Sequence, residues 1–272
     1  MKEKKKISIG TVIFYMIPVC AAVAALFFGR LFARDYLEYK EAVDEYERID
    51  SDYIKDDTGT SDYTDDDSQD DPARLTFFPD LNIDFKGLRN VNSDLACVLY
   101  IPVLKIQYPV VYSADNEEYL HRTFEGNYNS SGCIFYDYQS EKDFRGQHTF
   151  IFGHNMKNGS MFGRLKKFES DPDTASKHPY FYIYTDGKVR KYEIFSFYQT
   201  TSEGTTYQSF TDDKGYDKYI SYCLGNSYFK GYRNRIDFSE RPGIVTLSTC
   251  IGQAGGNERF VVHGALIAES VS

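Results

Sequence analysis

The chain has 272 residues and a formal net charge of −9, which is long enough for one sizeable folded domain with additional segments. Ten aspartates against one lysine in residues 49–71 account for that charge, and the neutral remainder lacks the basic excess of nucleic-acid-binding proteins, so no nucleic-acid partner is expected. The five scattered cysteines show no CxxC spacing, which argues against a zinc site and a dense disulfide framework.

The N-terminus joins a basic segment to a long apolar run. Residues 1–6, MKEKKK, contain four lysines, and residues 7–29 carry no charge. At about 1.5 Å per helical residue, such a run can cross a bilayer core of about 30 Å. The positive-inside rule then predicts a cytoplasmic tail at 1–6, a transmembrane anchor at 7–29 and everything later outside the cell. A cleaved signal peptide is the alternative, although the run is long and lacks a clear A-x-A site.

Two segments with different patterns follow the apolar run. Residues 30–48 are predicted to form an amphipathic juxtamembrane helix, because apolar residues recur at spacings of four and three. These residues are Phe32, Tyr36, Tyr39, Val43 and Tyr46. Residues 49–73 are aspartate-rich and poor in apolar residues, which predicts a disordered acidic linker. A calcium site there is the alternative, but the segment has no D-x-D-x-D-G loop with a terminal glutamate.

Residues 74–272 are predicted to form one mainly β domain, because short β-branched and aromatic runs alternate with turn residues. The predicted strands are Cys97–Ile101, Ile106–Tyr112, Gly132–Tyr136, His148–Gly153, Tyr180–Tyr184, Lys188–Gln199, Gly243–Cys250 and Arg259–Ala268. The predicted helices are Leu81–Asn90, Asn116–Thr123, Met161–Glu169 and Asp213–Leu224. Eight strands with few long helices favour a closed or nearly closed β-barrel.

One predicted strand, GIVTLSTC, ends in Cys250 beside a glycine-rich turn. A thiol at the end of a strand can be reached by a substrate, whereas a thiol in mid-strand usually belongs to the core. Cys250 is therefore a candidate nucleophile, with a structural role as the alternative. Cys97, Cys133 and Cys223 are interpreted as small buried hydrophobic residues, and a Cys97–Cys133 disulfide remains open.

A nucleophilic cysteine requires a base or a cation nearby, because the thiolate is the attacking species. His154 in HTFIFGHNM ends an apolar strand and is the candidate base. His148 begins the same strand, and His263 lies inside FVVHGAL, where a core position is expected. His121 and His178 have surface interpretations.

Arg259 opens the last predicted strand, where its fixed charge could stabilise an oxyanion beside the thiol. A surface ion pair with Glu258 is the alternative.

Three of these motifs together resemble the sortase family of cysteine transpeptidases. They are TLSTC (246–250), FGHNM (152–156) and ERFVVHGAL (258–266), in which the family's His, Cys and Arg fall on His154, Cys250 and Arg259. YIPVLKIQYPVVYSADNEEYLHRTFEG (100–126), GCIFYDY (132–138) and a helical insert near 211–226 resemble class B sortases in particular. The resemblance covers about residues 76–269. It departs from the class B pattern at Ala96-Cys97, where Gly-Trp is common.

The resemblance implies an eight-stranded barrel with N-terminal helices and a helical insert before the penultimate strand, and 74–272 then form the catalytic domain. It implies cleavage of a C-terminal sorting motif, of NPxTx or xPxTG type, after its threonine. The protein would then pass through a thioacyl-enzyme to an amine of peptidoglycan or lipid II, without metal or organic cofactor. Substrate-binding residues would be Asn116, Leu120, Phe152, Ser248 and Thr249, although a helix cap at Asn116 and core positions for Leu120 and Phe152 are alternatives.

Two other functions compete with cell-wall anchoring. A pilin-polymerising sortase would use a protein lysine as the acceptor, but the acidic segment lacks the Asp-Pro-aromatic signature of such enzymes' lids. A non-catalytic membrane-tethered adhesion or scaffold module would make Cys250 incidental.

Overall fold

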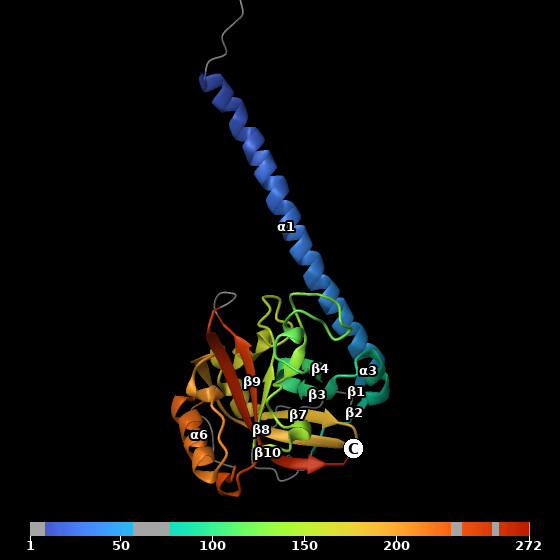
Figure 1. Ribbon diagram of the computed structural model, residues 1–272, viewed down its shortest axis with the longest axis vertical. Helices are drawn as coiled ribbons and strands as arrows, with labels where there is room; N and C mark the ends of the chain where they lie inside the picture. The colour runs from blue at the N-terminus through green and yellow to red at the C-terminus, as the bar shows by residue number, and fades with distance from the viewer. Residues whose placement is uncertain (1–8, 57–76, 230–235, 252–255, 272) are drawn as a thin grey trace, which may run out of the picture.

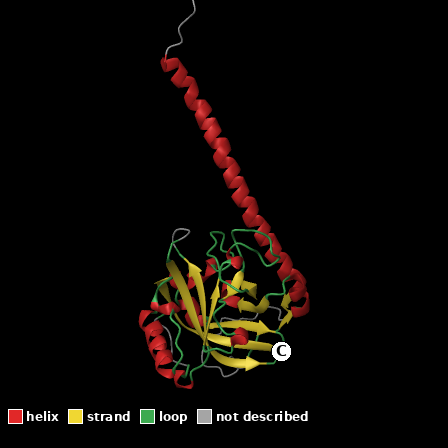
Figure 2. Ribbon diagram, viewed as in Figure 1, coloured by secondary structure: helices red, strands yellow, loops and turns green. Residues whose placement is uncertain are grey.

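A β-barrel forms the centre of the molecule in the computed structural model, which describes residues 9–56, 77–229, 236–251 and 256–271. In this part of the chain, eight strands close in the order β10-β8-β7-β3-β4-β5-β6-β9 (Figures 1 and 2). The strands are β3 (Leu95–Ile101), β4 (Ile106–Tyr112), β5 (Ile134–Tyr136), β6 (His148–Phe152), β7 (Tyr180–Thr185), β8 (Lys188–Thr201), β9 (Ile244–Cys250) and β10 (Glu258–Ser270). The predicted closed barrel is confirmed, and each strand end lies within two residues of its prediction.

The barrel is covered on part of its outer face by helix α6 (Asp213–Asn226), which lies between β8 and β9. Tyr216, Tyr219, Ile220 and Cys223 of this helix are buried in a second apolar cluster outside the barrel. The cluster also takes side chains from three strands, namely Phe195, Tyr198, Ile244, Val261 and Ala265. Residues on both faces of β8, β9 and β10 are therefore buried, and the predicted helical insert before the penultimate strand is confirmed.

Three predicted helices are shorter or differently placed than expected. Residues Leu81–Ile83 form strand β2, and helix α3 (Phe85–Val91) begins only after Asp84, which caps it by accepting from Gly87 N. In the range 116–123 there is one 3₁₀ turn, η2 (Glu118–Leu120). The range 161–169 contains η4 (Gly163–Lys166) and α4 (Lys167–Ser170). The remaining short elements are α5 (Asp173–Lys177), η1 (Pro102–Leu104), η3 (Lys142–Phe144), η5 (Thr205–Tyr207) and η6 (Phe238–Glu240).

A single long helix, α1 (Ile9–Tyr53), precedes the barrel, and strand β1 (Ile54–Asp56) follows it and pairs with β2. The juxtamembrane helix therefore continues five residues past its predicted end at 48. Residues 49–56 of the predicted linker are ordered, whereas 57–73 lie outside the described residues. The first half of α1 is long and apolar enough to cross a membrane, which is consistent with a single-pass anchor.

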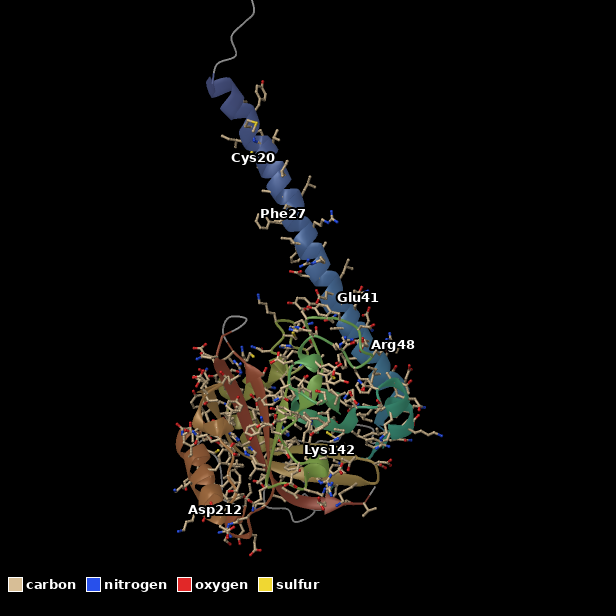
Figure 3. All side chains as sticks on the ribbon, viewed as in Figure 1. Cys20, Phe27, Glu41, Arg48, Lys142 and Asp212 are labelled. Carbon is tan, nitrogen blue, oxygen red and sulfur yellow. The ribbon has the colours of Figure 1, made fainter. Side chains whose placement is uncertain are left out.

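The apolar stripe predicted on residues 30–48 divides into two parts. Phe32 and Tyr36 are exposed, whereas Tyr46 is buried against the barrel together with Ile49. Figure 3 shows Cys20 and Phe27 on the part of α1 that extends away from the barrel, and Arg48 beside the barrel. The C-terminal part of α1 therefore packs on the barrel domain, which was predicted to begin only at residue 74.

Beneath α6, two histidines share one threonine hydroxyl. Thr246 Oγ1 lies 2.7 Å from His148 Nε2 and 2.8 Å from His263 Nδ1. His263 is fully buried, as its sequence context predicted. Burial lowers the pKa of His148 to about 3 and the pKa of His263 well below its ordinary value. Both imidazoles are therefore neutral in the folded protein.

This pair predicts acid lability. A histidine with an ordinary pKa of about 6.5 in the unfolded chain binds protons there before it does so in the folded protein, so stability falls as the pH decreases below about 6.5. We expect the free energy of unfolding to be about 4 kcal/mol lower at pH 5 than at pH 7, about 2 kcal/mol from each histidine. Urea unfolding at both pH values measures this difference, and His148→Gln should reduce it. An unchanged difference in that variant would contradict the assignment.

Candidate active site

Cys250 and Arg259 lie opposite each other on neighbouring antiparallel strands. Cys250 is the last residue of β9, Arg259 is the second residue of β10, and the register pairs them directly. Directly opposed residues of an antiparallel pair point to the same face, with Cβ atoms about 4.5–5.5 Å apart. The side chains of Cys250 and Arg259 are therefore attached to adjacent backbone positions at one end of the barrel.

His154 reaches the same end of the barrel through the parallel pairing of β6 with β9. Phe152 pairs with Ser248, and Gly153 N donates to Ser248 O at 3.2 Å. Thr249 Oγ1 donates to Gly153 O at 2.7 Å, which ties the two strands together. A Cβ at Gly153 would lie 2.4 Å from Ile134 Cδ1 and 2.9 Å from the Phe162 ring, so a larger residue beside the histidine would displace these side chains. This pairing places His154 next to Cys250.

The imidazole of His154 is held by a backbone carbonyl. Its Nε2 lies 2.8 Å from Leu120 O, and because a carbonyl oxygen only accepts, Nε2 must carry the proton. Nδ1 is then the nitrogen that can exchange a proton during a reaction. Burial lowers the pKa of His154, although the Leu120 hydrogen bond opposes that effect. Neutral imidazole therefore predominates at pH 7.

Cys250 differs from the other cysteines of the domain in its exposure. Cys97, Cys133 and Cys223 are buried free thiols, so the Cys97–Cys133 disulfide left open by the sequence does not form. Burial raises the pKa of Cys133 and of Cys223 to about 12, so neither thiol ionises at neutral pH. Cys250 is a free cysteine of intermediate exposure at a strand end, as expected for a thiol that a substrate can reach.

The Arg259 guanidinium donates to two carbonyl oxygens of its own turn. Nη1 lies 2.7 Å from Gly256 O and 2.9 Å from Glu258 O. Within the described part of the chain, Arg259 forms no ion pair with the Glu258 carboxylate that was considered as the alternative. These contacts use one nitrogen, so the remaining donors of the fork are available to a ligand.

One pocket of about 350 Å³ joins all of these groups. It is lined by each of the eight residues that the sequence analysis selected, namely His154, Cys250, Arg259, Asn116, Leu120, Phe152, Ser248 and Thr249. They come from η2 and the turn before it, from β6 and the residues that follow it, and from β9 and β10. Residues distant in sequence therefore share one concave surface.

The polar side chains predicted to bind substrate make specific contacts. Asn116 Nδ2 donates to Asp137 Oδ1 at 2.7 Å, and Asn116 Oδ1 accepts from Tyr138 N at 3.1 Å. The helix-cap alternative for Asn116 is wrong, because Asp115 accepts from the backbone N–H groups of Glu117 and Glu118 instead. The Asn116 amide is thus fixed in orientation at the pocket wall.

Tyr207 is a pocket residue that the sequence analysis missed. Its hydroxyl lies 2.6 Å from Ser248 Oγ, and its ring stacks on Phe150 and Phe152 with centroids 5.4 and 6.4 Å away. Burial raises the pKa of Tyr207 to about 12, so the hydroxyl stays protonated. Asp137 was also missed and is the only carboxylate lining the described pocket. Both lie in turns without a periodic pattern, so local sequence carried no signal.

Comparison with known proteins identifies the family to which this chain belongs. The sequence profile described as "Sortase domain" matches residues 99–267, which is more than half of the chain. The chain belongs to the sortase family. The match spans the barrel from β3 to β10 and includes His154, Cys250 and Arg259.

Several sortases of class B are similar to this sortase. It is 32% identical to sortase B of Listeria monocytogenes over 189 residues, covering 68% of this chain and 75% of that protein. It is 27% identical to sortase B of Staphylococcus aureus over 169 residues, covering 61% and 67%. The crystal structure of Clostridium perfringens sortase B superposes with a TM-score of 0.61 at 32% identity, covering 67% of this chain and 99% of that one. This sortase is therefore a class B-like cysteine transpeptidase, and a non-catalytic adhesion module is excluded.

Proposed function

We propose that this sortase is a membrane-anchored, extracytoplasmic transpeptidase that cleaves a C-terminal sorting motif after threonine and transfers the protein to a cell-wall amine. The motif would be of NPxTx or xPxTG type, and the acceptor an amine of peptidoglycan or lipid II. The observation that carries the proposal is that Cys250, His154 and Arg259 line one pocket although three separate segments supply them.

In the first half-reaction, the Cys250 thiolate attacks the carbonyl carbon of the threonine. Arg259 is the only arginine or lysine lining the described pocket, and its free donors would stabilise the oxyanion that forms. The carbon–nitrogen bond then breaks, and His154 donates the Nδ1 proton to the leaving amine. The product is a thioester between Cys250 and the protein.

In the second half-reaction, the acceptor amine attacks the thioester carbonyl. His154 takes the proton from the attacking nitrogen, and Cys250 leaves as a thiolate. The aromatic side chains of Phe150, Phe152 and Tyr207 line the pocket beside Cys250. An apolar wall of this kind would limit the access of water, which otherwise hydrolyses the thioester.

A peptide panel tests the proposal. The full-length protein in detergent micelles is incubated with NPxTx and xPxTG peptides, with and without added amines, and mass spectrometry locates the broken bond. We expect cleavage after threonine and an amide product when an amine is present. Cleavage at another bond, or none in either series while a methanethiosulfonate still modifies Cys250, would contradict the proposal.

Anchoring to the wall is favoured over pilin polymerisation because the acidic segment 49–71 contains no Asp-Pro-aromatic sequence. Mass spectrometry of cross-linked products from cells separates the two alternatives. A bond to a peptidoglycan amine supports wall anchoring, and an isopeptide bond to a protein lysine supports pilin polymerisation. The proposed topology has residues 1–6 in the cytoplasm, residues 7–29 in the membrane and the barrel outside.

A further inference from the structure

The C-terminal part of α1, residues 38–48, contacts one loop of the barrel, residues 121–132, through several hydrogen bonds. The buried carboxylate of Glu45 accepts from Glu125 N at 2.9 Å and from Asn127 Nδ2 at 3.3 Å. The buried Tyr46 hydroxyl donates to Gly132 O at 3.1 Å. One helix thus holds the middle and the C-terminal end of this loop, and Glu45 and Tyr46 make the buried contacts.

Two further contacts on the exposed side of α1 join the same elements. Glu38 Oε1 accepts from Ser130 N at 2.6 Å, and Arg48 forms a 2.6 Å ion pair with Glu125. Exposed pairs of this kind contribute little to stability, so the buried contacts of Glu45 and Tyr46 should dominate.

The 121–132 loop packs directly on the carbonyl that holds His154. Gly132 has a φ of +56°, and a Cβ there would lie 2.5 Å from Tyr119 O and 2.8 Å from Leu120 O. Cys133 N also donates to Tyr119 O at 2.9 Å. The backbone at Gly132 is therefore in close contact with the Leu120 carbonyl, which accepts from His154 Nε2 at 2.8 Å.

These contacts form a continuous path from α1 to the imidazole. We propose that Glu45 and Tyr46 are positioning residues for His154, which act by fixing the 121–132 loop and through it the Leu120 carbonyl. Two residues in the C-terminal part of α1 then position a catalytic group, while the apolar part of the same helix is the proposed membrane anchor. The inference rests on the proposed role of His154.

The Leu120 hydrogen bond favours the protonated imidazole, because a carbonyl oxygen stabilises the N–H donor of the charged form. If the Leu120 carbonyl moves, the imidazolium becomes less stable and its pKa falls further. Less His154 is then available in the form that protonates the leaving amine. Because the peptide-binding wall at Asn116 is held by Asp137, outside this loop, the effect should fall on kcat more than on KM.

The test uses Tyr46→Phe and Glu45→Gln in the full-length protein. Each change removes or weakens one buried contact, and we expect each to lower kcat for peptide cleavage about fivefold to tenfold with little change in KM. Nuclear magnetic resonance titration of His154 should give a lower pKa than in the unmodified protein. Thermal unfolding is measured alongside, and kcat is compared at a temperature at which every variant is folded.

Matched controls come from the same helix. Tyr39→Phe removes a hydroxyl from a half-buried tyrosine, and Glu41→Gln neutralises an exposed glutamate one turn from Glu45. Both controls should keep kcat and the His154 pKa. An unchanged kcat and an unchanged His154 pKa in both Tyr46→Phe and Glu45→Gln would overturn the inference. If His154→Gln itself left cleavage intact, the proposed function would fail instead, so the two failures are distinguishable.

Discussion

Cys250→Ala is expected to lower the rate of sorting-peptide cleavage by at least about a thousandfold, because no other group in the pocket can form the thioester. Ser248 and Thr249 lie beside Cys250, but the Ser248 hydroxyl contacts Tyr207 and the Thr249 hydroxyl donates to Gly153 O. Neither hydroxyl is therefore placed as a replacement nucleophile. Cleavage rates and the mass of the acyl-enzyme, measured on full-length protein in micelles, test this expectation.

A matched control removes a thiol elsewhere. Cys20→Ala deletes the exposed cysteine of the apolar half of α1 and should leave cleavage unchanged. In that background a methanethiosulfonate should modify Cys250 selectively, because the other three thiols are buried, and modification should stop cleavage. The nucleophile assignment fails if Cys250→Ala cleaves at the original rate with an unchanged melting temperature.

His154→Gln is expected to have the second largest effect, a loss of about a hundredfold to ten-thousandfold in kcat. The glutamine amide can still donate to a carbonyl such as Leu120 O, but it cannot carry a proton to the leaving amine. Because burial already lowers the pKa of His154, the protonated imidazolium is a minority species at neutral pH. Cleavage by the unmodified enzyme should therefore depend strongly on pH, and the variant should lose the part of the profile that His154 determines.

His178→Gln is the control for this substitution. His178 follows α5, outside the pocket, and is half-buried. Its replacement should keep both kcat and the pH profile. Single-turnover measurements of acylation from pH 5 to pH 9 distinguish a lost proton donor from weaker substrate binding, since weaker binding would raise KM and preserve the shape of the kcat profile.

The barrel could be predicted from sequence because each strand is marked locally. Runs such as IQYPVVY and FVVHGAL are rich in β-branched and aromatic residues and are bounded by turn residues. The pairing order could not be derived from these patterns, because residues of β8, β9 and β10 are buried on both faces and show no alternation. The number of strands favoured a closed or nearly closed barrel, and the resemblance to a known family implied the eight-stranded barrel.

The end of α1 could not be predicted because tertiary contacts determine it. Residues 49–53 include aspartate and serine, which are weak helix formers, so the local pattern favours an end at residue 48. In the structure, Ile49 is buried, and the Tyr53 ring packs so closely on Gly87 that a Cβ there would lie 2.6 Å away. Burial of these side chains extends the helix against its intrinsic propensity.

Some residues of the candidate site could likewise be predicted from sequence, and others could not. His154, Cys250 and Arg259 were found because each stands at a strand end beside a turn. Tyr207 could not be found, since its contact with Ser248 spans 41 residues and depends on how η5 folds over the sheet. The role of Leu120 as a hydrogen-bond acceptor was also hidden, because its backbone oxygen, and not its side chain, makes the contact with His154.

With the proposed topology, the continuous course of α1 would fix the distance between the membrane and the end of the barrel that carries Cys250. Figure 1 shows β9 and β10 meeting at the end of the barrel toward which α1 rises. If residues 7–29 occupy the bilayer, only residues 30–37 separate the lipid from the first residue that contacts the barrel, Glu38, a helical strut of about 12 Å. Such a strut would keep the thiol near the outer leaflet. Under the proposed function, clients and acceptors still tethered to lipid would therefore meet the enzyme at far higher local concentration than material deep in the wall.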